Sequence, residues 1–227
     1  MIHFQGVSKI YNTKSKALDN VTFKIDDHEF VSFVGKSGAG KSTVVKMLIG
    51  EEIPSRGRVI LNSIDVAKLP RTQLPLLRRK IGVIFQDYRL LPHKTVFENV
   101  AFALEVNGRS EREIKEFVPQ AIELVGLKDY AARFPHELSG GEKQRAAIAR
   151  ALIHHPDVLI ADEPTGNLDA INTWEVIKLL VKINELGTTV ILATHDKDVI
   201  NTLGKRVVTL DNGRVIRDEA DGKYIIA

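Results

Sequence analysis

Hydrophobic residues along this chain gather in four short runs, and stretches with a helical spacing of apolar residues lie between them. The runs are Phe30–Val34, Val83–Phe85, Val158–Ala161 and Thr189–Ala193. They are rich in β-branched residues, which is typical of strands that are covered on both faces. Strands of this kind that alternate with helices predict a parallel sheet built from βαβ units.

The pattern changes near the N-terminus and again in the middle of the chain. Three segments are expected to be short antiparallel strands joined by polar turns: Ile2–Lys9, Ala17–Ile25 and Arg58–Leu61. Residues 87–154 are predicted to be mostly helical, and within them Ser110 and Glu113 have the spacing of a capping box. The helix that Ser110 opens is expected to end near Gly126.

This layout predicts a single α/β domain with a helical subdomain inserted in it. The length of 227 residues suits such a domain. We expect residues 1–86 and 155–227 to form the sheet core together with the N-terminal antiparallel part. Residues 87–154 are expected to form the helical subdomain.

Composition excludes several classes of function. The chain has no cysteine, which rules out disulfides, thiolate metal sites and cysteine nucleophiles. The net charge of +3 comes from 32 basic and 29 acidic residues, and the short basic run Leu77–Lys80 predicts a solvated or partner-contacting surface rather than nucleic-acid binding.

Met1–Gln5 lacks the profile of a signal peptide, and no apolar stretch approaches the roughly 18 residues of a membrane span. Any membrane role is therefore expected to come through a partner.

A phosphate-binding loop follows the first of the four core strands. It consists of Gly35, Lys36, Ser37, Gly38, Ala39, Gly40, Lys41 and Ser42. The loop matches G-x-x-x-x-G-K-[ST] between a strand and a helix that begins at Thr43, which is the context that makes this motif credible. Backbone N–H groups and the helix N-terminus are expected to bind the phosphates of a nucleoside triphosphate. Lys41 would bridge the β- and γ-phosphates, and the hydroxyl of Ser42 would ligate Mg²⁺.

Two carboxylates end another core strand. Val158–Ala161 runs directly into Asp162 and Glu163. Placed beside the phosphate loop, Asp162 would hold Mg²⁺ and Glu163 would act as the general base for the attacking water. Adjacent acids also occur at the ends of strands without any function, and the phosphate loop upstream is what favours catalysis here.

A serine and two glycines precede a strong helix that is predicted over Lys143–Ile153. Ser139 and Glu142 have the spacing of a capping box, and Gly140–Gly141 at a helix N-terminus can also bind an anion. At this point the sequence resembles the ABC ATPase superfamily, whose signature reads LSGGQ. In this chain Glu142 stands in place of the last residue of that signature. The resemblance implies a P-loop NTPase core of RecA-like fold with the two subdomains described above.

The resemblance extends to four further positions. Gln86 lies where the family has its Q-loop, which touches Mg²⁺ and the water and reports to a membrane partner. Asp169 closes Gly166–Asp169, which looks like the D-loop at the dimer interface. His195 matches the switch histidine that contacts the γ-phosphate, and Tyr11 occupies the place of the aromatic residue that stacks on adenine.

The family arrangement implies an ATP-dependent homodimer. The chain carries one copy of each motif, and in the family the phosphate loop of one subunit faces the signature of another. Ser139, Gly140, Gly141, Glu142 and Asp169 would therefore act in trans. Hydrolysis would loosen the dimer, and that change would be the power stroke.

Within the superfamily, Arg79–Pro92 and Thr95–Leu104 resemble the bacterial cell-division ATPases. That resemblance implies a peripheral protein at the cytoplasmic face of the inner membrane, at the division site, with an integral membrane partner docked near Gln86–Pro92. Tyr88, Leu90 and Leu91 are candidates for this contact, or they pack inside the helical insert. A lipoprotein-release, macrolide or peptide export ATPase is the alternative. A soluble ATPase acting on ribosomes or DNA, and a P-loop kinase or GTPase, fit the chain less well.

Overall fold

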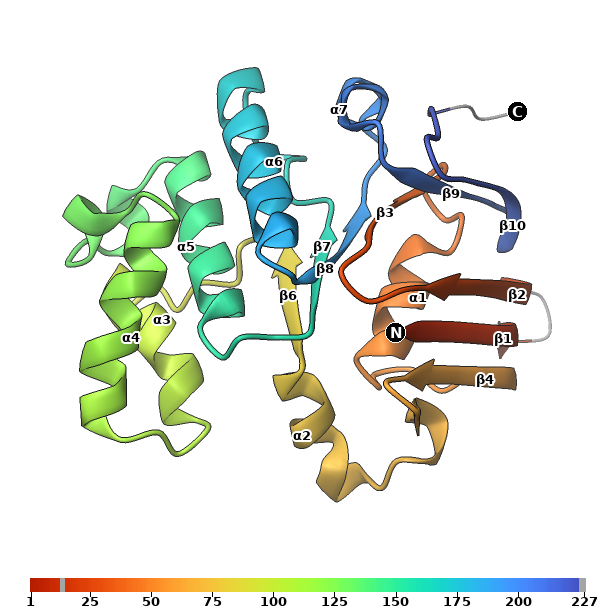
Figure 1. Ribbon diagram of the computed structural model, residues 1–227, viewed down its shortest axis with the longest axis horizontal. Coiled ribbons are helices and arrows are strands. Elements are labelled where there is room, and N and C mark those ends of the chain that lie inside the picture. Colours follow the sequence, from red (N-terminus) through yellow and green to blue (C-terminus); the bar gives the residue numbers. More distant parts are fainter. Residues whose placement is uncertain (13–14, 225–227) are drawn as a thin grey trace. The chain divides into compact units, whose positions relative to one another are not determined.

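The computed structural model describes residues 1–12 and 15–224, which form two compact units (Figure 1). Unit 1 consists of Met1–Arg78 and Asn184–Ala227, and unit 2 of Arg79–Ile183. The strands are β1 (Ile2–Asn12), β2 (Ser15–Ile25), β3 (Phe30–Val34), β4 (Arg56–Leu61), β5 (Ile64–Asp65), β6 (Ile81–Phe85), β7 (Val158–Asp162), β8 (Thr189–Ala193), β9 (Arg206–Asp211) and β10 (Arg214–Glu219). The α-helices are α1 (Lys41–Leu48), α2 (Leu74–Arg79), α3 (Val96–Glu105), α4 (Glu111–Leu124), α5 (Gly140–Leu152), α6 (Ala170–Glu185) and α7 (Lys197–Leu203). Short 3-10 helices lie at Val66–Lys68, Arg71–Gln73, Lys128–Tyr130 and Pro135–Glu137.

Unit 1 contains two groups of strands. One is an antiparallel sheet in the order β2-β1-β4-β5. In the other, β3 pairs in parallel with β8 on one side and with β9 on the other, and β10 pairs antiparallel with β9. The rings of Phe4, Phe23 and Phe33 pack in series, with centroids 4.5 Å and 5.1 Å apart, so that side chains of β1, β2 and β3 share one core.

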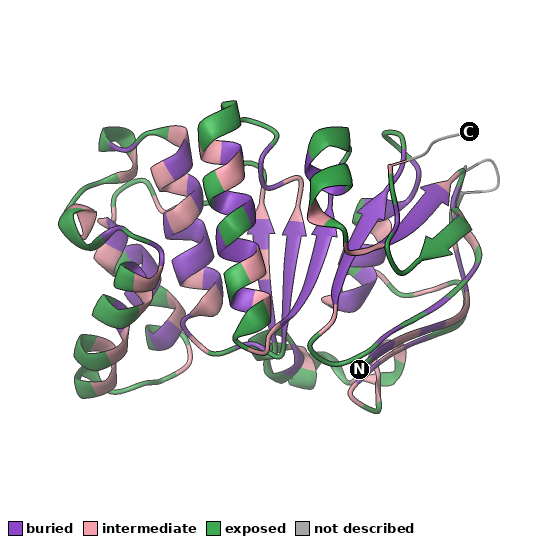
Figure 2. Cartoon of the chain, turned by 45° about the horizontal axis from the view of Figure 1, so that its top comes forward, coloured by how far each residue is buried: buried purple, intermediate pink, exposed green. Residues whose placement is uncertain are grey.

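Unit 2 pairs two parallel strands, β6 and β7, with a group of helices. Helices α3, α4 and α5 pack on one another, and α5 also contacts β6. Figure 2 shows the consequence for these helices, which are purple on the face that packs and green on the face that meets solvent. Asn99 on α3 is fully buried, and its amide donates to the carbonyl oxygens of Leu91, Lys94 and Thr95 at 2.8–3.1 Å. The chain that leads into α3 is thereby held to the helix.

The predicted elements are confirmed where the sequence pattern was strong. Strands β3 and β8 match the expected segments residue for residue, and β6 and β7 are slightly longer than expected. Ser110 caps α4 with both bonds of the capping box, and Gly126 follows the end of that helix with a φ of 70°. Strands β9 and β10 are additional to the sequence prediction. Across the described ranges, no helix combines the length and apolarity needed to cross a membrane.

Candidate nucleotide-binding site

The phosphate loop lies in unit 1, between β3 and α1. Helix α1 begins after Gly40, which has a φ of 110°, and the helix start has no side-chain cap and no acidic residue in its first turn. The first N–H groups of α1 are therefore available to an anion. Lys41 is 8% exposed, and its Nζ donates to the carbonyl oxygen of Gly35 at 2.7 Å and to that of Lys36 at 3.4 Å. Those bonds keep the ammonium group on the concave side of its own loop.

The loop rests on the strands at the C-terminal end of the chain. A β-carbon on Gly35 would overlap the carbonyl oxygen of Leu210 on β9, and the φ of Gly35 is 152°, so only glycine fits here. The backbone N–H of Gly213 donates to the carbonyl oxygen of Ala39 at 3.1 Å. The β9–β10 hairpin therefore forms the floor of the phosphate loop.

Two other predicted residues lie in unit 1. His195 is exposed and lies two residues after the end of β8. Phe33 of β3 pairs in parallel with Ala193 of β8, so the phosphate loop and His195 follow neighbouring strands at the same edge of the sheet. Tyr11 is 48% exposed on β1, and Nζ of Lys9 lies 5.0 Å from the centre of its ring. Both side chains are accessible to a ligand.

The remaining predicted residues lie in unit 2, where the acidic pair and the glutamine leave adjacent strands. Phe85 pairs with Asp162, so Gln86 and Glu163 follow paired positions of β6 and β7. Glu163 has a φ of 49°, a left-handed conformation that a non-glycine residue rarely adopts. Such backbone conformations concentrate at functional sites.

Gln86 is bonded to the segment that follows the acidic pair. Its Nε2 donates to Oδ1 of Asn167 at 3.2 Å, and Nδ2 of Asn167 donates back to the carbonyl oxygen of Gln86 at 3.3 Å. A β-carbon on Gly166 would lie 2.7 Å from Nε2 of Gln86. Gly166 and Asn167 therefore set the orientation of the Gln86 side chain. No motif in the sequence predicted this role for Asn167.

The signature serine caps helix α5 with a complete capping box. Oγ of Ser139 accepts from the N–H of Glu142 at 3.3 Å, and the carboxylate of Glu142 accepts from the N–H of Ser139 at 2.7 Å. Burial opposes ionisation of Glu142, but the bonds from Ser139, together with Tyr130 and the charge of Arg145, hold the pKa of Glu142 below its ordinary value. The predicted helix and its cap are confirmed, with the helix beginning at Gly140.

The glycines of the signature contact the D-loop side of unit 2. A β-carbon on Gly141 would overlap the side-chain amide of Asn172. Asn172 in turn donates to Asp169 with its backbone N–H at 2.9 Å and with Nδ2 at 2.6 Å, and these bonds lower the pKa of Asp169. Asn172 thus joins two predicted motifs, although no sequence motif singled it out.

No group of three histidine, cysteine or acidic side chains in the described ranges could hold a metal ion on its own. The oxygen donors predicted here are the hydroxyl of Ser42, the amide of Gln86 and the carboxylate of Asp162. Mg²⁺ takes oxygen ligands of these kinds and commonly completes its shell with water and substrate phosphates. The chemistry of each of these three side chains therefore suits Mg²⁺ that arrives with a nucleotide.

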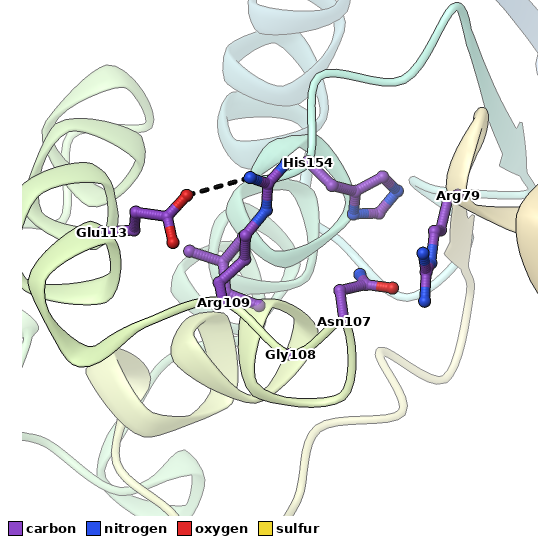
Figure 3. A pocket seen from close by; sticks show the side chains of 7 residues that line it. Arg79, Asn107, Gly108, Arg109, Glu113 and His154 are labelled. Carbon is purple, nitrogen blue, oxygen red and sulfur yellow. Dashed lines mark hydrogen bonds and ion pairs between the residues drawn. The ribbon is translucent and has the colours of Figure 1, made fainter.

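A separate pocket of about 310 Å³ lies in unit 2, away from these motifs in the sequence (Figure 3). It is lined by Arg79, Leu104, Asn107, Gly108, Arg109, Glu113 and His154. Arg109 is paired with Glu113 at 2.9 Å, and burial lowers the pKa of His154. None of the predicted site residues lines this pocket.

Comparison with known proteins places the chain in one family. Residues 18–166 match the model of the ABC transporter family. The chain is 51% identical over 224 residues to the cell division ATP-binding protein FtsE of Bacillus subtilis (strain 168), covering 99% of this chain and 98% of that protein. It is 45% identical to FtsE of Escherichia coli (strain K12), covering 95% and 97% of the two chains. A dimeric ATP-binding cassette in a post-hydrolysis state, bound to ADP and Pi, superposes with a TM-score of 0.88 at 36% identity, covering 99% of this chain and all of that one.

The chain therefore belongs to the ABC transporter family, and it is an ATP-binding cassette ATPase of that family. Within the family it is similar over nearly its whole length to the FtsE proteins. The predicted fold class, an α/β nucleotide-binding domain with an antiparallel β part and a helical part, is confirmed by these relatives.

Proposed function

We propose that this chain is the ATP-hydrolysing subunit of a membrane complex of the FtsE type, acting in cell division. The observation that carries this proposal is the 45–51% identity to FtsE proteins over nearly the full length of both chains. Its integral membrane partner would be a protein of the FtsX kind, docked near Gln86–Pro92. The complex would sit at the cytoplasmic face of the inner membrane, at the division site, and control peptidoglycan hydrolysis.

The residues of the site divide the work of hydrolysis. The phosphate loop from Gly35 to Thr43 binds the phosphates of ATP, and Lys41 neutralises charge on the β- and γ-phosphates. Tyr11 stacks on the adenine, and His195 contacts the γ-phosphate. Ser42, Gln86 and Asp162 would hold Mg²⁺, which would supply charge neutralisation at the phosphates.

Glu163 accepts a proton from the attacking water as general base. The left-handed backbone at Glu163, with a φ of 49°, supports a functional role because such strain is rarely kept without one. Gln86 orients the water and is itself oriented by Asn167. General-base catalysis is typically worth about 10²–10⁴ in rate.

The second subunit completes each site. Ser139, Gly140, Gly141, Glu142 and Asp169 would reach the nucleotide of the partner copy. The likeness to dimeric ATP-binding cassettes, with TM-scores of 0.88, supports this arrangement. We also keep the division in which residues 87–154 form the helical subdomain that carries the signature.

Glu163→Gln tests the catalytic assignment. The variant should bind ATP as the parent protein does, lose at least about 100-fold in steady-state ATPase rate and accumulate as an ATP-bound dimer. Size-exclusion chromatography with and without ATP measures the dimer, and an equilibrium binding assay measures affinity. A steady-state ATPase rate in Glu163→Gln equal to that of the parent protein would contradict the role of Glu163 as general base.

A photo-crosslinking residue at Leu90 tests the partner. Leu90 lies in the proposed docking segment, and Ile216 on β10, 43% exposed, serves as the control position. We expect Leu90, and not Ile216, to crosslink to a membrane protein of the FtsX kind in intact cells. A crosslink to an export permease instead would favour the alternative, an ATPase for lipoprotein release or for macrolide or peptide export.

A further inference from the structure

The segment after Gln86 adopts a strained backbone conformation. Tyr88 and Arg89 have φ values of 57° and 49°, and neither is a glycine. Two successive L-residues in the left-handed region are disfavoured because each β-carbon approaches a carbonyl oxygen. Arg89 contacts Asp87 and the ring of Phe85 within the segment, and contacts from outside it offset the remaining cost.

Arg150, in the last turns of helix α5, supplies such contacts. Its Nη1 donates to the carbonyl oxygen of Arg89 at 2.6 Å, and its Nη2 donates to that of Tyr88 at 2.9 Å. Burial lowers the pKa of Arg150, and its hydrogen-bond partners among the described residues are these two carbonyls rather than a carboxylate. The planar fork of a guanidinium can bond two adjacent acceptors at once, which an ammonium cannot do in the same geometry.

Tyr88 extends the contact to the other end of the same helix. A β-carbon on Gly140, the first residue of α5, would lie 3.1 Å from the hydroxyl of Tyr88. Burial raises the pKa of Tyr88, so its hydroxyl remains protonated. The residue is therefore held at its backbone by the C-terminal part of α5 and packs with its ring end against the signature glycine.

We propose that Arg150 is a positioning residue that fixes the left-handed turn at Tyr88–Arg89 and makes this turn and the signature helix move as one body. The idea rests on the proposed roles of Gln86 and of Ser139–Gly141 in the ATPase reaction. A partner that shifts the turn then shifts the signature serine as well, because both are attached to α5. Asn99, which holds Leu91, Lys94 and Thr95, fixes the following residues independently.

Hydrogen exchange in the full chain tests the link. In Arg150→Met, amides in two peptides, residues 86–92 and 139–145, should exchange about tenfold or more faster than in the parent protein, because charge-assisted bonds to two carbonyls are lost. The phosphate-loop peptide, residues 35–46, should be unchanged. Arg145→Met is the matched control, since Arg145 lies on the same helix and bonds Glu175 instead of the turn.

The steady-state kinetics separate positioning from a general loss of fold. Arg150→Met should lower kcat about tenfold and leave KM for ATP within about twofold, since the phosphate loop is intact. Arg150→Lys keeps the charge and can bond one carbonyl, so it should recover part of both the exchange protection and kcat. This second variant also keeps the test valid if Arg150→Met is too unstable to study.

Two results would overturn the proposal. One is parental exchange rates at residues 86–92 and 139–145 in both Arg150 variants. The other is an equal effect of Arg145→Met on these peptides. Gln86→Ala serves a different purpose: normal hydrolysis by that variant would remove the proposed role of Gln86 while leaving the exchange result, and so the link through Arg150, intact.

Discussion

Helices α1 and α5 both begin at a glycine-containing motif, but their N-termini are built in opposite ways. Helix α1 starts after Gly40 with no side-chain cap and no acid in its first turn. Helix α5 starts after Ser139, and Glu142 in its first turn completes a capping box. The N-terminus of α1 is therefore open to an anion, whereas that of α5 already carries the carboxylate of Glu142.

The cap of α5 is built like those of its neighbours. Helices α3 and α4 carry the same two bonds, between Thr95 and Glu98 and between Ser110 and Glu113. What distinguishes α5 is Gly140–Gly141, packed against Tyr88 and Asn172. The start of α5 therefore differs from those of its neighbours in two missing side chains, whereas the start of α1 differs from all three in its uncapped loop.

The largest loss of ATPase rate should come from removing the positive charge of the phosphate loop beside the N-terminus of α1. Lys41→Ala removes the ammonium group that lies within its loop, and we expect at least about a 100-fold loss of ATPase rate, as for other groups that stabilise transition-state charge. Lys46→Ala, an exposed lysine in the last turn of the same helix, is the control and should cost little activity. Coupled phosphate-release assays measure both, and similar losses in the two variants would contradict the assignment.

Gly141→Ala should have the next largest effect, on stability as well as on activity. The added methyl group overlaps the side chain of Asn172, so that side chain must move, and its Nδ2 bond to Asp169 is strained or lost. Overpacking of this kind typically costs about 1–3 kcal/mol. Urea unfolding measures the loss, and the double variant Gly141→Ala with Asn172→Ala should lose less stability than the sum of the two single changes.

Ser139→Ala and Ser110→Ala compare the same cap at two helices. Each variant should lose about 1 kcal/mol of stability, because each removes one side-chain acceptor of a capping box. Only Ser139→Ala should also lower ATPase activity, since Ser110 lies in no nucleotide motif. Equal activity in the two variants would mean that Ser139 is a cap and nothing more.

The smallest effect should come from Glu142→Gln, which keeps an acceptor for the N–H of Ser139 but removes its charge. The folded-state pKa of Glu142 is lowered, so its ionisation stabilises the fold above the unfolded-state pKa, and this contribution is lost as pH falls through the folded value. The parent protein should thus be more stable than the variant at neutral pH by about 0.3–1 kcal/mol, and the gap should close in acid. Urea midpoints across this pH range measure it.

The same substitution should help ATP to bind. If the N-terminus of α5 faces the nucleotide of the partner copy as proposed, removing its carboxylate should lower the apparent KM for ATP about two- to fivefold. An unchanged KM would indicate that the charge of Glu142 is not felt by the nucleotide.

Much of the fold followed from the sequence because short apolar runs leave few choices for buried strands. Strand β9 was not predicted, although Val207, Val208 and Leu210 are apolar and buried and Thr209 between them is itself buried at 1% exposure. Strand β10 is mostly exposed and polar, and its pairing with β9 supplies the order that its own residues do not encode.

The predicted site residues were found through motifs, but their supports were not. Asn167, Asn172 and Arg150 act through contacts with residues distant in the chain, and such contacts leave no local pattern. An Asn three residues after Asp169 at a helix start was the one usable signal, since side chains of this kind often bond there.

The floor beneath the phosphate loop has a consequence for inheritance. A premature stop codon after Gly204 would leave every motif residue from Tyr11 to His195 encoded. It would also delete Leu210, against whose carbonyl Gly35 is packed, and Gly213, which bonds Ala39. Such an allele would still encode every nucleotide-binding motif, but its product would lack the strands against which the phosphate loop packs.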